Sequence, residues 1–310
     1  MDGRLWTRLY REIRRLGKPL SVSTRMGRPR VYDTEEVLAV WAFASLMDWP
    51  ISVTHDRLAQ GATGWWLRRH WRWRSRIPSV ATLTRRGKAP DFRWALRRLL
   101  WRLRRRPGRR PKRHLVMDST FLLTGPYSRD ADSHWSCHGG KWFRGYALHA
   151  IVDETGMLCA WHVTSANVQE MKVARRLVRQ VAVANATARR WLIADSGYDS
   201  EPLHQLVRRR LGAQLIAPLN LRGAKTDRWR ARQPGRDACD RVLNSRQGQA
   251  LVRRRSVIER WNSWFKGHSN VSMLPYHVRR LSRVRRWINL KLAVFFVHQC
   301  LSQLDVTTAA

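Results

Sequence analysis

One basic segment divides the sequence into two parts with different periodicity. Residues 104–114 read RRRPGRRPKRH, and Pro107, Gly108 and Pro111 interrupt any regular element there. Before this segment, apolar residues recur at the three- and four-residue spacing of helices. After it, they alternate or form short runs rich in β-branched residues. This change predicts an all-α domain followed by an α/β domain.

The domain limits follow from the same change. We predict a basic, flexible arm over residues 1–25, a helical domain over residues 26–110 and an α/β domain over residues 111–310. A chain of 310 residues is long enough for two ordinary domains, and its 44% hydrophobic composition with 17 Trp supplies a sizeable core.

Four helices are predicted in the helical domain. They cover residues 34–47, 50–60, 78–86 and 91–106. The first should begin at a Thr34 N-cap, with two acidic residues in its first turn. Several short helices, one of them basic, are typical of a helix-turn-helix DNA reader, although any small helical domain has a similar pattern. Arg85 and Arg86 are the candidate DNA-contacting residues of this region.

The α/β domain is predicted to contain a mixed sheet flanked by helices. The expected strands are 114–122, two strands within 145–167, one within 189–195 and one within 213–218. Helices are expected over residues 168–183, from about 200 to 211, and over 253–268 and 277–303. The early strands form a meander, and the later ones alternate with helices and should run parallel. Residues 220–246 are polar and predicted to form a loop.

The charge of the chain limits its partners. Sixty Lys and Arg residues oppose 22 Asp and Glu residues, for a formal net charge of +38. Most of the basic residues are Arg, which suits bidentate contacts with phosphate. A surface that serves only solubility normally mixes both signs, so the imbalance points to a polyanion, most simply nucleic acid. No apolar run of membrane length or signal peptide is found, and we expect a cytoplasmic protein without a membrane partner.

The predicted helix 253–268, RRRSVIERWNSWFKGH, holds one acidic residue, Glu259, among many basic ones. At about 100° per residue, Arg255, Glu259 and Lys266 fall within roughly 40° of one line along the helix. An apolar stripe lies on a different side of the helix: Ile258, Trp261 and Phe265. We therefore predict a packed helix that presents Arg, Glu and Lys on a shared polar face.

Two further carboxylates lie on predicted strands. Asp118 lies within an apolar strand, where a carboxylate is costly unless it is paired or bound to metal. Asp195 ends a later strand, and strand-end carboxylates of α/β sheets collect in one crevice. Glu259 could complete the set from a helix packed across that crevice. Simpler alternatives are a turn cap for Asp195 and an ion pair with Arg255 for Glu259.

Three carboxylates from separate elements suit a hard divalent cation. Mg²⁺ prefers oxygen ligands and takes its remaining ligands from water and substrate phosphates. Two such ions about 4 Å apart can activate a water or a 3′-hydroxyl and stabilise the leaving oxygen. A competing zinc cluster would draw on His134, Cys137, His138, Cys159 and His162. Cys159 and His162 lie three apart on a predicted strand and face opposite sides, which disfavours joint ligation.

The motifs MDST, ADSGYDS and RRRSVIERWNSWFK resemble the three acidic motifs of the DDE transposases of bacterial insertion sequences. They are most similar to the group with the signature Tyr-x2-Arg-x3-Glu-x6-Lys. Arg255, Glu259 and Lys266 match its spacing, whereas Val252 stands at the Tyr position. FRGYALHAIVDETG with TSANVQE resembles the family's hairpin between the first two acids. GRPRVYDTEEVLAVWAFASLMDWPISV and PSVATLTRR resemble its DNA-binding region, so the resemblance extends from about residue 26 onward.

The resemblance implies an RNase H-like catalytic domain in which Asp118, Asp195 and Glu259 bind two Mg²⁺ or Mn²⁺ ions. Water would cleave the element ends, and the freed 3′-hydroxyl would attack target DNA. Arg255 and Lys266 would contact phosphates of the ends. The protein would act on double-stranded DNA as a homodimer on paired ends, in the bacterial nucleoid. Alternatives are a nuclease that cuts without joining, an inactive remnant, and a non-enzymatic DNA-binding protein.

Overall fold

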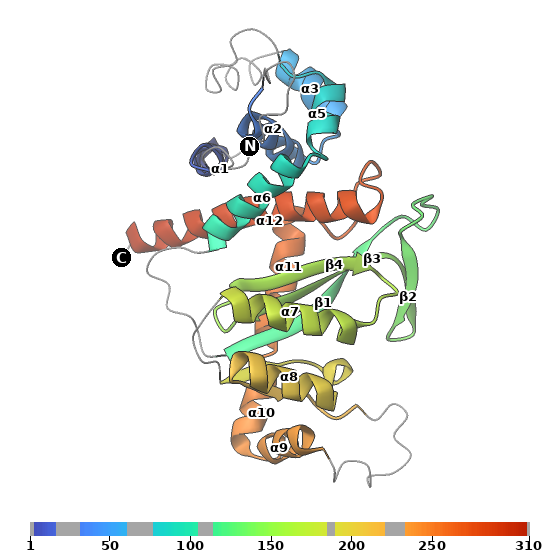
Figure 1. Cartoon of the computed structure of the whole chain (residues 1–310), viewed down its shortest axis with the longest axis vertical. Coiled ribbons are helices and arrows are strands. Elements are labelled where there is room, and N and C mark those ends of the chain that lie inside the picture. Colours follow the sequence, from blue (N-terminus) through green and yellow to red (C-terminus); the bar gives the residue numbers. More distant parts are fainter. Residues whose placement is uncertain are drawn as a thin grey trace. The chain divides into compact units, whose positions relative to one another are not determined.

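The structure is a computed structural model, and it describes residues 3–16, 32–60, 77–104, 114–184, 190–220 and 233–308 (Figure 1). The chain divides into two compact units, Met1–Pro107 with Arg286–Ala310, and Gly108–Arg285. The division therefore falls within the last helix, α12 (Leu281–Thr308). The sequence partition placed all of residues 111–310 in one domain, whereas the structure groups the C-terminal segment with the N-terminal helices.

The N-terminal unit is helical. Besides the C-terminal part of α12, its helices are α1 (Gly3–Arg14), α2 (Thr34–Met47), α3 (Ile51–Ala59), α5 (Val80–Arg86) and α6 (Pro90–Arg104). The four helices predicted from the sequence are confirmed as α2, α3, α5 and α6. α2 lies at the centre of the unit, because α1, α3, α5 and α6 all contact it. Their helix-turn-helix character stays a prediction.

The first residues form a helix rather than the predicted arm. α1 buries one apolar face, formed by Leu5, Trp6, Leu9 and Ile13. The Trp6 ring meets Phe43 of α2 edge-on, with 5.1 Å between ring centroids. The arm prediction is therefore wrong for Gly3–Arg14, because the basic charge masked an apolar stripe at helical spacing. The rest of the predicted arm, residues 17–25, lies outside the described residues.

The start of α2 differs by one residue from the prediction. Asp33, not Thr34, is the N-cap, and its backbone N–H donates to the Glu36 carboxylate at 2.9 Å. Within the described ranges, no single helix is long and apolar enough to cross a membrane. α2 and α3 reach that length and apolarity only as a pair, and the chain bends by 106° between them.

The second unit is built on a mixed sheet. Its strands are β1 (His114–Leu123), β2 (His134–His138), β3 (Lys141–Asp153), β4 (Leu158–Ser165), β5 (Trp191–Ile193) and β6 (Gln214–Ile216). The strand order is β2-β3-β1-β5-β6, and β4 also pairs with β3. β3 runs antiparallel to its partners, whereas β1, β5 and β6 are parallel. The predicted mixed sheet is confirmed; β2, a short strand that is exposed along most of its length, was missed.

Helices cover both faces of this sheet, as predicted. α7 (Glu170–Ala184) and α8 (Glu201–Leu211) share one apolar core with the sheet, and α11 (Ser256–Ser269) contacts β1 and β3. Figure 1 shows α7 in front of the sheet and α11 behind it. The predicted helix began at residue 253, but Arg253 is the last residue of a separate helix, α10 (Arg246–Arg253), and α11 begins at Ser256.

The segment predicted as a loop over residues 220–246 contains a helix, α9 (Pro234–Leu243). The backbone N–H groups of Gly235 and Arg236 donate to Glu201 on α8, each at 3.1 Å. A carboxylate at a helix N-terminus satisfies donors that have no partner inside the helix. The prediction was wrong because this partner lies more than thirty residues away in the sequence. Residues 221–232 lie outside the described ranges.

Replacing Leu9 by Ala tests the helix α1. Leu9 is fully buried, so Leu9→Ala should lower the free energy of unfolding by about 2–5 kcal/mol. Arg11→Ala, at an exposed position of the same helix, should stay within about 0.5 kcal/mol of the parent. Urea unfolding followed by Trp fluorescence measures both. Equal stability of the two variants would return this segment to the role of an arm.

Candidate active site

Strand pairing brings Asp118 and Asp195 to the same level of two neighbouring parallel strands. β1 and β5 run parallel, and Val116 is paired with Ile193. Asp118 and Asp195 each lie two residues beyond this pair, in the same chain direction. Their charges interact, because Asp195 contributes to raising the pKa of Asp118. The structure therefore brings together these two predicted site residues.

The surroundings of the Asp118 carboxyl group disfavour its charged form. Burial raises its pKa from 3.8 to about 6. A hydrogen bond from the Ser119 backbone and the charge of Arg255 act against this rise, whereas Asp195 and Glu170 add to it. At neutral pH, Asp118 is an anion that lacks full solvation, which favours any cation that approaches it.

Glu170 is a third carboxylate at this position, and the sequence analysis did not identify it. It is the first residue of α7, and it accepts a hydrogen bond from the Ser119 hydroxyl. Burial raises the pKa of Glu170, and Asp195 raises it further. A Cβ atom on Gly197 would lie 3.1 Å from Asp195 Oδ1 and 3.2 Å from Glu170 Oε2. The carboxylates of Asp195 and Glu170 therefore flank Gly197.

Two buried polar side chains face these carboxylates without full hydrogen bonding. Tyr198 is 1% exposed, and its hydroxyl makes no well-formed hydrogen bond among the described residues. The nearby Ser119 hydroxyl acts to lower the pKa of Tyr198. Burial raises the pKa of Tyr198, and Glu170, Asp118 and Asp195 raise it further. Asn262 on α11 is 9% exposed; its Nδ2 donates to Asp118 Oδ2 at 3.4 Å, and its Oδ1 has no described partner.

Two cations, Lys266 on α11 and Arg255 just before it, lie near the Asp118 carboxylate. The apolar stripe of Ile258, Trp261 and Phe265 is buried as predicted. The charge of Arg255 lowers the pKa of Asp118, and the charge of Asp118 raises the pKa of Lys266. Burial lowers the pKa of Lys266, and Asp118 acts against this decrease.

Glu259 is placed differently from the two Asp residues. Its side chain is 56% exposed and is paired with Arg255, with 3.2 Å between Oε1 and Nη2. Glu259 is absent from the groups that shift the pKa of Asp118, whereas Glu170 is among them. The structure thus links Glu259 to the site through Arg255, in the ion pair that the sequence offered as the simpler alternative.

The donor set fits a hard cation, although no closed site exists. Among the described residues, no three His, Cys, Asp or Glu side chains are arranged to hold one metal ion together. Mg²⁺ keeps several waters and is usually completed by substrate phosphates, so two or three protein carboxylates suffice. The unpartnered Tyr198 hydroxyl and Asn262 Oδ1 are polar atoms that coordinated water could satisfy. Asp118, Asp195 and their neighbours therefore fit Mg²⁺ or Mn²⁺.

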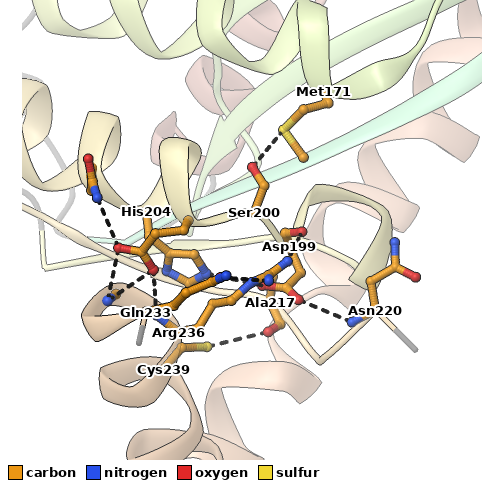
Figure 2. Close-up of polar contacts among 12 residues, drawn as sticks. Met171, Asp199, Ser200, His204, Ala217, Asn220, Gln233, Arg236 and Cys239 are labelled. Carbon is orange, nitrogen blue, oxygen red and sulfur yellow. Dashed lines mark hydrogen bonds and ion pairs between the residues drawn. The ribbon is translucent and has the colours of Figure 1, made fainter. Parts of the chain in front are cut away.

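A buried ionic network fixes the turn that follows Asp195 (Figure 2). The Asp199 carboxylate accepts from Arg236 Nε at 2.9 Å and from the Asn220 backbone N–H at 3.2 Å, and it contacts His204 Nε2 at 3.3 Å. Burial alone would raise the pKa of Asp199, but these three partners outweigh burial and lower it. The network joins the turn, α8 and α9, so Asp195 sits on a rigid support.

The two predicted DNA-contacting residues of the N-terminal unit, Arg85 and Arg86, lie in different environments. Arg85 is exposed. Arg86 is 12% exposed, and it donates to the Tyr32 carbonyl, the Thr34 hydroxyl and the Asp91 carboxylate at 3.0–3.2 Å. These contacts tie α5 to the starts of α2 and α6. Arg86 is thus engaged within the unit, and Arg85 is the better placed of the two for an external phosphate.

The family of the chain is now shown by comparison. The model of the family "Transposase DDE domain" matches residues 109–296, so the chain belongs to this family. This confirms the resemblance to DDE transposases; the insertion-sequence origin and the signature around Val252 stay predictions. No curated protein sequence matches the chain.

Among solved structures, one similar chain is the piggyBac transposase in a cryo-EM structure of its synaptic complex with hairpin DNA. The two chains are 11% identical, with a TM-score of 0.45. The match covers 96% of this chain and 73% of that one.

Asp118→Asn should stabilise the metal-free protein at neutral pH. The folded state binds the Asp118 proton more tightly than the unfolded state, so stability falls as pH rises from about 4 to about 6. At pH 7.5, removing this charge should add about 3 kcal/mol, at about 1.4 kcal/mol per pKa unit. Below pH 4 the gain should vanish. Urea unfolding at pH 7.5 and pH 3.5 without divalent cations measures this, and a loss equal at both pH values would contradict it.

Proposed function

We propose that the chain is a DNA transposase that cleaves the ends of its element and joins the freed 3′-hydroxyl ends to target DNA. The observation that carries the proposal is that Asp118 and Asp195 lie close together on neighbouring parallel strands, in a chain of the transposase DDE domain family. An RNase H-like catalytic domain agrees with the mixed sheet, in which Asp118 lies within β1 and Asp195 follows the neighbouring parallel strand β5.

The proposed roles of the acids combine their positions with the family's three acidic motifs. Asp118, Asp195 and Glu259 would hold two Mg²⁺ or Mn²⁺ ions, which when bound activate the attacking oxygen and neutralise charge on the leaving oxygen. Asn262 holds the Asp118 carboxylate through its amide. Arg255 and Lys266 would bind phosphates of the element end beside Asp118. A phosphate that takes Arg255 would release Glu259 from its ion pair and let it turn toward the site.

The charge of the chain supports double-stranded DNA as the partner. A net charge of +38 is distributed through both units, and the N-terminal unit would bind the element ends through its short helices. A homodimer on paired ends and a location at the nucleoid in the bacterial cytoplasm are part of the same proposal.

Strand cleavage and joining on a duplex with the element ends test the proposed reaction. Wild-type protein should give cut and joined products with Mg²⁺ or Mn²⁺ and none with EDTA. Glu259→Gln and Asp118→Asn should lose at least about 100-fold in rate, since each removes a charge that holds the cations. Glu154→Gln, on the β3–β4 turn, is the matched control and should remain active.

Other outcomes of this assay decide between the alternatives. Cut products without joined products would identify a nuclease instead of a transposase. Cleavage by Glu259→Gln at the wild-type rate would remove Glu259 from the site. Tight DNA binding with no products in either metal would indicate an inactive remnant, and Val252→Tyr would then test whether the residue at the family's Tyr position is the cause.

Arg85→Ala and Arg86→Ala form a matched pair for DNA binding. Arg85→Ala should weaken duplex binding and flatten its salt dependence by about one charge, without a change in stability. Arg86→Ala should instead lower the free energy of unfolding by about 1–3 kcal/mol, because it leaves buried partners unsatisfied. Binding at several salt concentrations and urea unfolding measure the two effects. Equal salt slopes for Arg85→Ala and wild type would exclude a phosphate contact.

A further inference from the structure

We propose that Glu170 is a cation-binding carboxylate that acts together with Asp118 and Asp195. It lies outside the three acidic motifs and would bind the same class of ion, Mg²⁺ or Mn²⁺. The inference rests on the proposed function, because it adds a residue to the same site.

The position of Glu170 is set by α7. This helix starts at Glu170, beside β1, and the Ser119 hydroxyl holds the Glu170 carboxylate. Ser119 directly follows Asp118, so the two neighbours contact elements on opposite faces of the sheet: Ser119 contacts α7 and Asp118 contacts α11. Asp195 lies just beyond the end of β5, and its charge raises the pKa of both Asp118 and Glu170.

Glu170 and Asp195 lie near each other although their negative charges repel. Asp195 Oδ1 and Glu170 Oε2 lie 3.1 and 3.2 Å from the position that a Cβ atom on Gly197 would occupy. Asp195 accepts a hydrogen bond from the Gly197 backbone N–H at 2.9 Å, which accounts for its own position but gives no favourable interaction with Glu170. Partly buried like charges repel each other, and a divalent ion between them converts this repulsion into attraction.

A second observation points to the same ligand. The Tyr198 hydroxyl is buried near Glu170, Asp118 and Asp195 with no well-formed hydrogen bond, although Ser119 lies close to it, and Asn262 Oδ1, on the residue that donates to Asp118, has no described partner. Buried polar atoms of this kind are rare in native proteins. Water molecules coordinated to a cation are donors with fixed positions, and they would also give the Tyr198 oxygen an acceptor role.

Binding of Mn²⁺ to the whole chain, followed by electron paramagnetic resonance, tests Glu170 without using activity. Glu170→Gln should weaken Mn²⁺ binding by about 10–100-fold, and Asp118→Asn should weaken it at least as much. Glu154→Gln loses the same charge from the β3–β4 turn, where the half-buried Glu154 pairs with Arg254, and should bind as wild type does. Ser119→Ala frees the Glu170 carboxylate from its hydrogen bond and should retain or strengthen binding.

Stability without divalent cations separates a ligand from a structural residue. If Glu170 serves the cation, Glu170→Gln relieves repulsion in the metal-free protein, so its melting temperature should hold or rise. The increase of melting temperature on adding Mn²⁺ should then shrink. A structural role predicts the reverse: a lower melting temperature without metal and an unchanged response to Mn²⁺. That result, or wild-type Mn²⁺ affinity in Glu170→Gln, would overturn the inference.

The outcomes distinguish this inference from the proposed function. If Asp118→Asn loses Mn²⁺ binding and cleavage while Glu170→Gln keeps both, Glu170 is excluded and the transposase proposal stands. If the wild-type chain neither binds Mn²⁺ nor cleaves DNA, the proposed function fails, and the inference fails with it.

Discussion

The parallel pairing of β1 with β5 is the constraint on which the site depends. It places Asp118 and Asp195 each two residues beyond the paired Val116 and Ile193, at the same level of neighbouring strands. The arrangement costs stability, because burial and mutual repulsion raise the pKa of Asp118 to about 6. A fold that retains such a pair stores electrostatic energy which a bound cation can release. The surrounding elements either compensate this charge or hold it in place.

Two kinds of support surround the carboxylates. α11 approaches from one face with Asn262, Lys266 and the preceding Arg255, which supply a hydrogen bond and positive charge. Behind Asp195, the buried network of Asp199 and Arg236 fixes the turn. The first support is polar and open, which suits exchange with DNA phosphates. The second is buried and saturated with hydrogen bonds, which suits a rigid platform.

Local sequence patterns predicted most of the elements but not their long-range partners. The helices α2, α3, α5 and α6 and the strand around Asp118 follow from periodicity and from turn residues, which act within a few positions. The helices α1 and α9 were missed for different reasons. In α1 the basic charge concealed an apolar stripe, and α9 depends on Glu201, which lies far away in the sequence. Arg86 was predicted at a surface, whereas its partners Tyr32 and Asp91 make it internal.

The sequence by itself determined the excess of positive charge, the two types of domain and the motifs that contain Asp118, Asp195 and Glu259. These features depend on composition and on short spacings along the chain. Only the tertiary structure decided which carboxylates meet: Glu170 lies beside Asp195, whereas Glu259 lies with Arg255. Spacing along a helix fixes the direction of a side chain on that helix, but not what the sheet presents to it. The companion of a buried charge is therefore set by strand order and helix packing.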